Sequence, residues 1–413
     1  MTLRAEPVGE ELPIGRRVAY WRGRRKLSQQ VFADRLGKSK SWVDKVERGE
    51  RRLDKFSVLL DMAGVLQISV DTLIGQAENT QTVVTTDHVD LDRLRLALTR
   101  FAPAAYLGNP APPLPLTDLN KAVTHAWLTL QHARYDTLVR DLPGLLGQVQ
   151  AADAYHSGSN GDRAASLLGQ VYQVTSCVLR KLGAYDLARL TAERAISIAV
   201  RTGDALRAGT GTTRFANALL AAGHARQAFE ANIVTAHRLA PDGATWADPD
   251  RVSVYGSLLL QAAMAAAHLG DHASVRELLR EAKVAADSIG KDDNHLRTSF
   301  GPTNLQLHVA AAAVELGDGG RAVAIHHGLN QRRFDALMPE RRAQHLLDIA
   351  RSHVIEGDMR RAGECLVEAD QIAPAEIRTR PIASDVMAEI LRRTPGTPPA
   401  LVTDLADRMG ARV

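Results

Sequence analysis

Apolar residues recur every three or four positions along almost the whole chain, which is the period of an amphipathic helix. No segment shows the two-residue alternation that a half-buried strand would need. The hydrophobic pattern therefore predicts an all-α protein.

Residues 28–49 contain two short apolar faces separated by a tight turn. Phe32, Ala33 and Leu36 form the first face, and Val43 and Val46 form the second. Ser28 and Ser39 stand where each helix would need an N-cap, and Gly37 can adopt the left-handed backbone that ends a helix. The spacing predicts a helix, a short turn and a second helix.

These residues resemble the lambda-repressor-like, Cro-type (XRE-type) helix-turn-helix family. The positions in register with that family's pattern are Ser28-Gln29, Phe32-Ala33, Leu36-Gly37, Ser39, Ser41-Trp42-Val43, Val46-Glu47 and Gly49. The resemblance covers residues 12–75. It implies binding to double-stranded DNA, with residues 39–48 as the helix that enters the major groove.

The resemblance also implies roles for single residues on this second helix and in the turn before it. The base-reading candidates are Lys40, Ser41, Asp44 and Lys45, and the phosphate-contacting candidates are Gln29, Lys38, Ser39 and Arg48. Asp44 has two interpretations, since it could accept a hydrogen bond from a cytosine amino group or form salt links with Lys40 and Arg48. Lys38 is either a phosphate contact or an exposed turn residue. Trp42 is expected to pack against its own domain.

The pattern around this motif predicts a five-helix domain over residues 1–75. Its first helix begins near Pro13 and should turn its arginines outward, Arg22 among them, while two more helices follow Asp54. Residues 76–118 are predicted to form a linker with one helix, residues 88–101, and a proline-rich segment.

An internal repeat occupies the chain from residue 119 onward. Its copies share a glycine followed by apolar positions, and these glycines are Gly183, Gly223, Gly270, Gly317 and Gly357; a weaker copy begins near Ala133. The copies resemble tetratricopeptide repeats, whose small position would be filled by Ala188, Ala228, Ala322 and Ala362. We therefore predict a right-handed α-solenoid over residues 119–375 and capping helices over residues 376–413, because such helix pairs bury their apolar faces only by stacking.

Polar residues gather on the first helix of each repeat, which would line the concave face of a solenoid. The candidates for effector binding are Arg180, Thr213, Asn217, Gln261, Asn304, His308 and Arg351. Asn and Gln can both donate and accept hydrogen bonds, which suits the backbone of an extended peptide. Each of these residues could equally be a solvent-exposed helix position.

Charge separates the two parts of the chain. Residues 1–75 hold 15 Lys and Arg against 10 Asp and Glu, and the remaining residues hold 36 against 37. Only the first part is basic, as expected if that part alone meets a polyanion. The chain has no apolar run of about twenty residues and no signal-peptide core, so we expect a cytoplasmic protein that does not enter a membrane.

The sequence offers no recognisable catalytic or metal-binding arrangement. Cys177 and Cys365 are far apart and belong to no CxxC motif, which indicates buried thiols. His268 and His272 flank a glycine turn and lack the geometry of a helical metal site. We expect no enzyme activity and no cofactor.

The combination of a Cro-type domain and tetratricopeptide-like repeats resembles peptide-responsive, quorum-sensing regulators of Gram-positive bacteria, and the richness in Ala and Arg resembles actinobacterial proteins. It implies a homodimeric transcriptional regulator whose repeats sense a small signalling peptide. Two alternatives remain at this level: a DNA-tethered adaptor whose repeats dock another protein, and a groove that binds a small metabolite.

Overall fold

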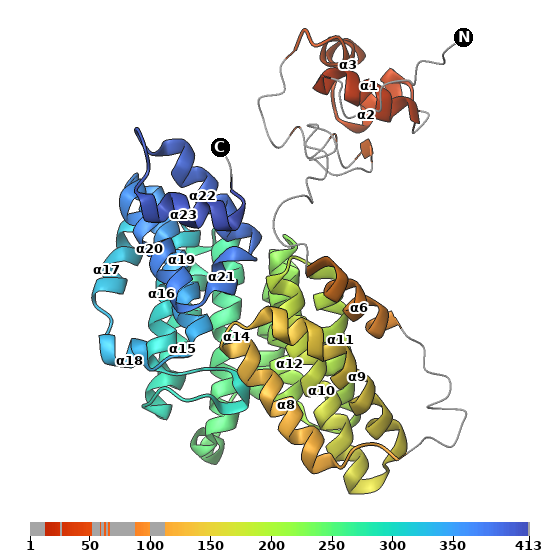
Figure 1. Cartoon of the computed structure of the whole chain (residues 1–413), viewed down its shortest axis with the longest axis vertical. Coiled ribbons are helices and arrows are strands. Elements are labelled where there is room, and N and C mark those ends of the chain that lie inside the picture. Colours follow the sequence, from red (N-terminus) through yellow and green to blue (C-terminus); the bar gives the residue numbers. More distant parts are fainter. Residues whose placement is uncertain are drawn as a thin grey trace. The chain divides into compact units, whose positions relative to one another are not determined.

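The computed structural model describes residues 13–24, 27–51, 58, 62, 65–66, 87–99 and 112–411. Every regular element in these ranges is a helix, so the predicted all-α fold is confirmed (Figure 1). The chain divides into two compact units, Met1–Thr82 and Val83–Val413. None of the described helices is both long and apolar enough to cross a membrane.

The first unit contains three described helices, α1 (Ile14–Arg24), α2 (Gln29–Arg35) and α3 (Lys40–Glu47). Its core is formed by Val18, Phe32, Ala33, Val43, Val46, Met62 and Leu66. Helices α1 and α3 cross closely at Gly15, where a Cβ atom would come within 2.1 Å of the Val46 carbonyl oxygen. The predicted fourth and fifth helices lie outside the described residues, apart from four positions between 58 and 66.

The second unit begins with α6 (Asp87–Thr99), which packs on α9, and continues as a series of antiparallel helix pairs. The pairs are α8 (Leu116–Gln131) with α9 (Tyr135–Tyr155), α10 (Gly158–Lys181) with α11 (Tyr185–Arg201), α12 (Ala205–Ala221) with α13 (Ala225–Leu239), α14 (Pro249–His268) with α15 (His272–Ile289), α16 (Pro302–Glu315) with α17 (Gly319–His327), and α19 (Pro339–Glu356) with α20 (Met359–Ile372). Short segments join some of them, namely η2 (Gly243–Ala247), η3 (His295–Arg297) and α18 (Gln331–Asp335).

A residue with left-handed backbone ends the first helix of each pair. The predicted turn glycines have φ values between 71° and 84°. In the weaker first copy, Ala133 takes the equivalent position with a φ of 53°. The local sequence thus sets where each pair turns, because glycine reaches this conformation without the steric cost of a Cβ atom.

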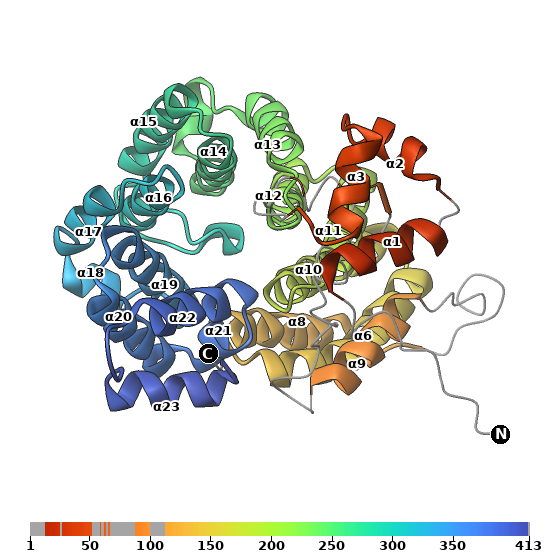
Figure 2. The same cartoon turned by 90° about the horizontal axis from the view of Figure 1, so that it is seen from above.

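Small residues allow the two helices of a pair to approach each other. Ala188, Ala228, Ala322 and Ala362 are all at most 1% exposed, in agreement with the predicted small positions. The first helix of each pair also contacts the first helix of the next, from α8 through α10, α12, α14 and α16 to α19. These first helices form the inner layer of the array, and the second helices form the outer layer (Figure 2).

The array closes into a ring, which the repeat pattern did not predict. Helix α19 contacts α8, and one continuous hydrophobic core joins residues of α6–α11 to residues of α19–α23. The last helices are α21 (Pro374–Arg378), α22 (Pro381–Arg393) and α23 (Ala400–Met409), and they pack on α19 and α20. In Figure 2 the end of the array lies beside its beginning. The inner helices therefore line the inside of the ring.

Candidate functional site

Two serine caps and one glycine build the turn between α2 and α3. Ser28 Oγ accepts a hydrogen bond from the backbone N–H of Val31 at 3.2 Å, and Ser39 Oγ accepts one from that of Trp42 at 3.1 Å. Gly37 has a φ of 62°. The predicted caps and turn are confirmed, and they determine where α3 begins.

Helix α3 has a buried face and an exposed face. Val43 and Val46 are at most 1% exposed and hold the helix against the core. Lys40, Ser41 and Lys45 are exposed. These base-reading candidates therefore lie on a part of α3 that a DNA groove could reach.

The phosphate-contacting candidates in and after the turn differ in their present contacts. Lys38 and Ser39 are exposed, although the Ser39 hydroxyl is engaged in its cap. Arg48 forms ion pairs with Asp44 at 2.7 Å and with Glu50 at 3.2 Å. Of the two interpretations of Asp44, the structure contains the salt link to Arg48. Exposed pairs of this kind are worth only about 0.3–0.5 kcal/mol, so Arg48 can exchange them for a phosphate.

A buried carboxylate joins the three described helices of the first unit. Glu47 is 6% exposed and accepts hydrogen bonds from Arg22 Nε at 2.5 Å, from Arg22 Nη2 at 3.1 Å and from Gln29 Nε2 at 2.8 Å. The expectation that Arg22 points outward was wrong, because its guanidinium neutralises this carboxylate. Gln29 likewise directs one amide hydrogen into the domain, so it positions α2 against α3.

A cavity lies between the inner helices of the second unit. It has two adjoining parts of about 110 and 340 Å³. The residues common to both parts are Arg180, Lys181, Asn217, Gln261, His308 and Arg341. All the residues predicted for the concave face line one part or both, namely Arg180, Thr213, Asn217, Gln261, Asn304, His308 and Arg351.

Hydrogen bonds fix the amide and imidazole groups in the middle of this wall. His308 Nδ1 lies 2.9 Å from the Asn304 carbonyl oxygen, and His308 Nε2 lies 3.2 Å from Gln261 Nε2. Burial, together with the charge of Arg341, lowers the pKa of His308 to about 3. The ring is therefore neutral at pH 7, with Nδ1 donating to the carbonyl and Nε2 accepting from the amide.

Two more of the predicted effector contacts, besides Gln261 and His308, are already engaged in the wall itself. Arg351 pairs with Glu315 at 2.6 Å and with Asp348 at 3.5 Å. The Thr213 hydroxyl donates to the Thr210 carbonyl oxygen at 2.7 Å. Among the cavity-lining residues predicted from sequence, Arg180, Asn217 and Asn304 keep side-chain groups that no described residue engages by a hydrogen bond or ion pair.

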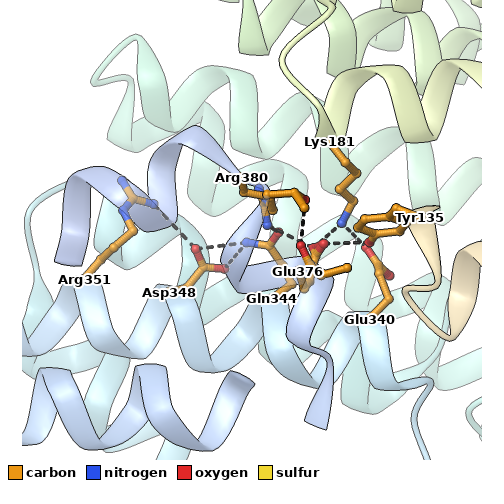
Figure 3. Close-up of polar contacts among 10 residues, drawn as sticks. Tyr135, Lys181, Glu340, Gln344, Asp348, Arg351, Glu376 and Arg380 are labelled. Atoms are coloured by element: carbon orange, nitrogen blue, oxygen red, sulfur yellow. Dashed lines mark hydrogen bonds and ion pairs between the residues drawn. The ribbon is translucent and has the colours of Figure 1, made fainter. Parts of the chain in front are cut away.

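A buried ionic network closes the ring beside this cavity (Figure 3). The Lys181 ammonium contacts the carboxylates of Glu340 and Glu376. Glu376 is fully buried, and it also accepts hydrogen bonds from the Tyr135 hydroxyl at 2.6 Å and from Arg380 Nη1 at 3.1 Å. The network therefore joins α9 and α10 near the start of the array to α19 and α21 at its end.

The electrostatics of the network keep its members in defined protonation states. Burial alone would raise the pKa of Glu340, but the charges of Lys181 and Arg341 lower it to about 2. Burial and the neighbouring Glu376 carboxylate raise the pKa of Tyr135 well above its usual value. Glu340 is thus ionised and Tyr135 protonated at neutral pH, as their hydrogen bonds require.

The described residues contain no group of three His, Cys, Asp or Glu side chains that could hold a metal ion. Cys177 and Cys365 are free thiols. Burial and nearby carboxylates raise the pKa of Cys365 to about 12, which makes this thiol a poor nucleophile. The chemistry available at the cavity is therefore hydrogen bonding and charge, supplied by amides, hydroxyls and arginines.

Comparison with known proteins identifies the first unit. Residues 13–73 match the family model of a helix-turn-helix domain. The amino-terminal unit is a helix-turn-helix domain. No curated protein matches the chain. Among solved structures, a similar chain is Bacillus thuringiensis PlcR in complex with the peptide PapR7 and DNA, with 11% identity, a TM-score of 0.30, and coverage of 67% of this chain and 95% of that chain. This likeness is too distant to carry a functional argument.

Sequence reasoning missed several cavity residues. Arg214 and Arg341 line the cavity from α12 and α19, and Arg297 reaches it from the segment between α15 and α16. Arg214 follows Thr213 directly. Because Thr213 was predicted on the concave face, the sequence could have placed Arg214 there too. The segment that carries Arg297 has no helical periodicity, and nothing in its sequence indicated that it would turn into the ring.

Proposed function

We propose that the chain is a sequence-specific, DNA-binding transcriptional regulator whose second unit binds a small peptide effector. The match of residues 13–73 to a helix-turn-helix domain supports the DNA-binding part. The exposed Lys40, Ser41 and Lys45 on α3 and the basic charge of the first 75 residues support it further. In this proposal Lys38, Ser39 and Arg48 contact phosphate groups of the DNA backbone.

The observation that carries the effector proposal is the polar cavity between the inner helices of the ring. Its wall presents Asn217, Gln261 and Asn304 in one small space. Side-chain amides pair well with the N–H and C=O groups of an extended peptide, whatever its side chains are. The small volume of the two parts, about 110 and 340 Å³, also favours a small ligand over a folded protein.

An effector can change DNA binding only by binding one arrangement of the protein better than another. We propose that the regulator acts as a homodimer on a two-fold symmetric operator, as helix-turn-helix proteins commonly do. A ligand that binds one state of the ring more tightly would then bias the spacing of the two helix-turn-helix domains. The adaptor model, in which the helical unit docks another protein, makes no such link between a small ligand and DNA affinity.

The experiment begins with capture of genomic DNA fragments by the purified full-length protein. Mobility shift on the recovered site follows, with and without a low-molecular-weight extract of the source organism's culture. A symmetric site whose occupancy changes with the extract is the expected result. A symmetric site that is indifferent to the extract, together with a co-purifying protein, would replace peptide sensing by the adaptor model. The absence of any specific site would overturn the proposal.

A further inference from the structure

Four arginines from different parts of the second unit line the first part of the cavity. Arg180 comes from α10, Arg214 from α12, Arg341 from α19, and Arg297 from the segment before α16. The repeats that supply them are separated in sequence, so the ring fold alone brings these guanidinium groups to one wall. All four are partly buried.

The four arginines bring more positive charge to this part of the cavity than its carboxylates can balance. The one carboxylate that lines this part of the cavity among the described residues is Glu340, and it is engaged by Lys181. No ion pair joins any of the four arginines to a carboxylate in the described ranges, whereas Arg351 and Arg380, which line the second part, form at least one each. Burial, followed by repulsion from Arg380, lowers the pKa of Arg180, although the carboxylates of Glu376 and Glu340 act in the opposite direction.

Contacts within the wall hold Arg214 in place, but polar atoms of the cluster remain without a hydrogen-bond partner. The Arg214 guanidinium lies over the Trp127 ring, 5.8 Å from its centroid, and its Nη2 donates to the Arg297 carbonyl oxygen at 2.8 Å. The Nε atoms of Arg214 and Arg341 are buried without a hydrogen-bond partner, and so is Oδ1 of Asn304 in the same wall. Buried donors and acceptors without a partner are costly unless a ligand engages them.

The segment that supplies Arg297 is conformationally strained. Leu296, Arg297 and Ser299 have φ values of 45°, 62° and 52°, a region that residues with a Cβ atom rarely adopt. In Figure 2 the connection between α15 and α16 extends into the ring. Strain of this kind persists where the surroundings enforce it, and it clusters at ligand-binding sites.

We propose that this arginine cluster binds a carboxylate of the ligand, so that the effector is an anionic peptide held by its free C-terminal carboxylate. The inference rests on the proposed peptide-sensing function and narrows it to a ligand class. A planar guanidinium gives paired hydrogen bonds to a carboxylate, and such charge-assisted bonds are about twice as strong as neutral ones. The neighbouring Asn217 and Gln261 would then meet the peptide backbone.

The test compares ligands that differ only in the charged group. N-acetylated pentaalanine with a free C-terminal carboxylate is titrated into the full-length protein, in parallel with the same peptide as its C-terminal amide, at equal ionic strength. Calorimetry gives the affinities, and thermal unfolding checks them by mass action. We expect the carboxylate peptide to bind at least about tenfold more tightly than the amide.

Pyrophosphate forms a third arm, because arginines also bind phosphates. If pyrophosphate binds and neither peptide does, the arginine cluster is an anion site but a peptide is not its ligand. That result would also contradict the proposed peptide-sensing function. Equal binding of the two peptides would overturn the arginine inference and leave peptide sensing intact. Binding of none of the three probes would overturn the anion site.

Variants separate a ligand-binding role of the arginines from a structural one. The double variant Arg297→Gln and Arg341→Gln should lose the preference for the carboxylate peptide. Its thermal midpoint without ligand should stay close to that of the wild type, because neither arginine forms an ion pair with a carboxylate among the described residues. Arg201→Gln is the matched control, since Arg201 pairs with Asp153 on the exposed surface at 2.9 Å. If the thermal midpoint without ligand falls in the double variant but not in the control, these arginines stabilise the fold, and the inference is wrong.

Discussion

Gly223 shows how much a single backbone angle contributes to the helix pairs. Its φ is 84°, and an added Cβ atom would meet no other atom within 4 Å, so a substitution there tests the backbone conformation alone. We expect Gly223→Ala to lower the free energy of unfolding by about 1 kcal/mol, because the left-handed penalty of about 1–2 kcal/mol exceeds the entropy gained. Chemical denaturation measures the change.

The same substitution in α9 supplies the control. Gly147 is an exposed helical glycine with open space around its Cβ position, so Gly147→Ala should raise the unfolding free energy by up to about 1 kcal/mol. Ala133 adopts the turn conformation without being glycine. The substitution Ala133→Gly should leave the free energy of unfolding almost unchanged. Relief of strain there is offset by the loss of a methyl group that is 5% exposed. Equal effects at Gly223 and Gly147 would contradict the assignment.

Two buried histidines make the second unit sensitive to mild acid. Burial lowers the pKa of His308 and of His345 to about 3, from an ordinary value of 6.5. The folded state binds these protons less readily than the unfolded state, so the stability is complete above pH 6.5 and is lost as the pH falls toward 3. Each histidine should cost about 1.4 kcal/mol by pH 5.5.

Denaturation curves between pH 7 and pH 5.5 measure this loss in the wild type and in single His308→Gln and His345→Gln variants. Each variant should remove a part of the pH dependence in that interval, since Asp and Glu carboxyl groups titrate mainly at lower pH. Some dependence should remain in both variants, because burial also lowers the pKa of His326 and of His353. A pH dependence that both variants leave unchanged would assign the acid sensitivity to other groups.

At the scale of one element, α3 combines a fixed buried face with an exposed face for DNA. We expect Lys40→Ala and Lys45→Ala to reduce discrimination between the operator and altered sites by about 1–3 kcal/mol where either residue reads a base. Gln29→Ala should instead weaken binding evenly across sequences, because Gln29 holds Glu47 at the end of α3 at 2.8 Å. Competition mobility-shift assays on operator variants measure both the affinity and the discrimination between sites. Lys121→Ala, on an exposed site of α8, is the control and should change neither quantity.

The local parts of each element were predictable from sequence. Ser28 and Ser39 act within three residues of their position, and the turn glycines act through their own backbone, so spacing alone was enough to place them. Arg22 was placed wrongly for the opposite reason. Its partner Glu47 lies 25 residues away on another helix, and a helical pattern cannot distinguish an arginine that neutralises a buried carboxylate from one that faces solvent.

At the scale of the whole molecule, the repeat pattern predicted the array but not its closure. Stacking of neighbouring pairs follows from apolar positions inside each copy. Closure depends on contacts between the first and last copies, such as that of Lys181 with Glu376, which are 195 residues apart. Lys181 sits in the last turn of a helix, where a solvated lysine is the usual occupant. The predicted concave residues line the cavity because the inner face is a property of each repeat, whereas Arg297 comes from a connection without a pattern.

The ionic network predicts how closure contributes to stability. Lys181→Met would leave Glu340 and Glu376 as buried carboxylates without their cation, and a broken buried pair costs about 3–5 kcal/mol. Arg201→Met, which breaks an exposed pair with Asp153, should cost less than about 1 kcal/mol. Adding Glu376→Gln to Lys181→Met should recover part of the loss, since one unpaired charge is then removed. Urea denaturation of the full-length protein gives these free energies. If the double variant were as unstable as the sum of its single variants, Lys181 and Glu376 would not act as a pair, and the ring would owe its closure to the hydrophobic core that joins α8 to α19.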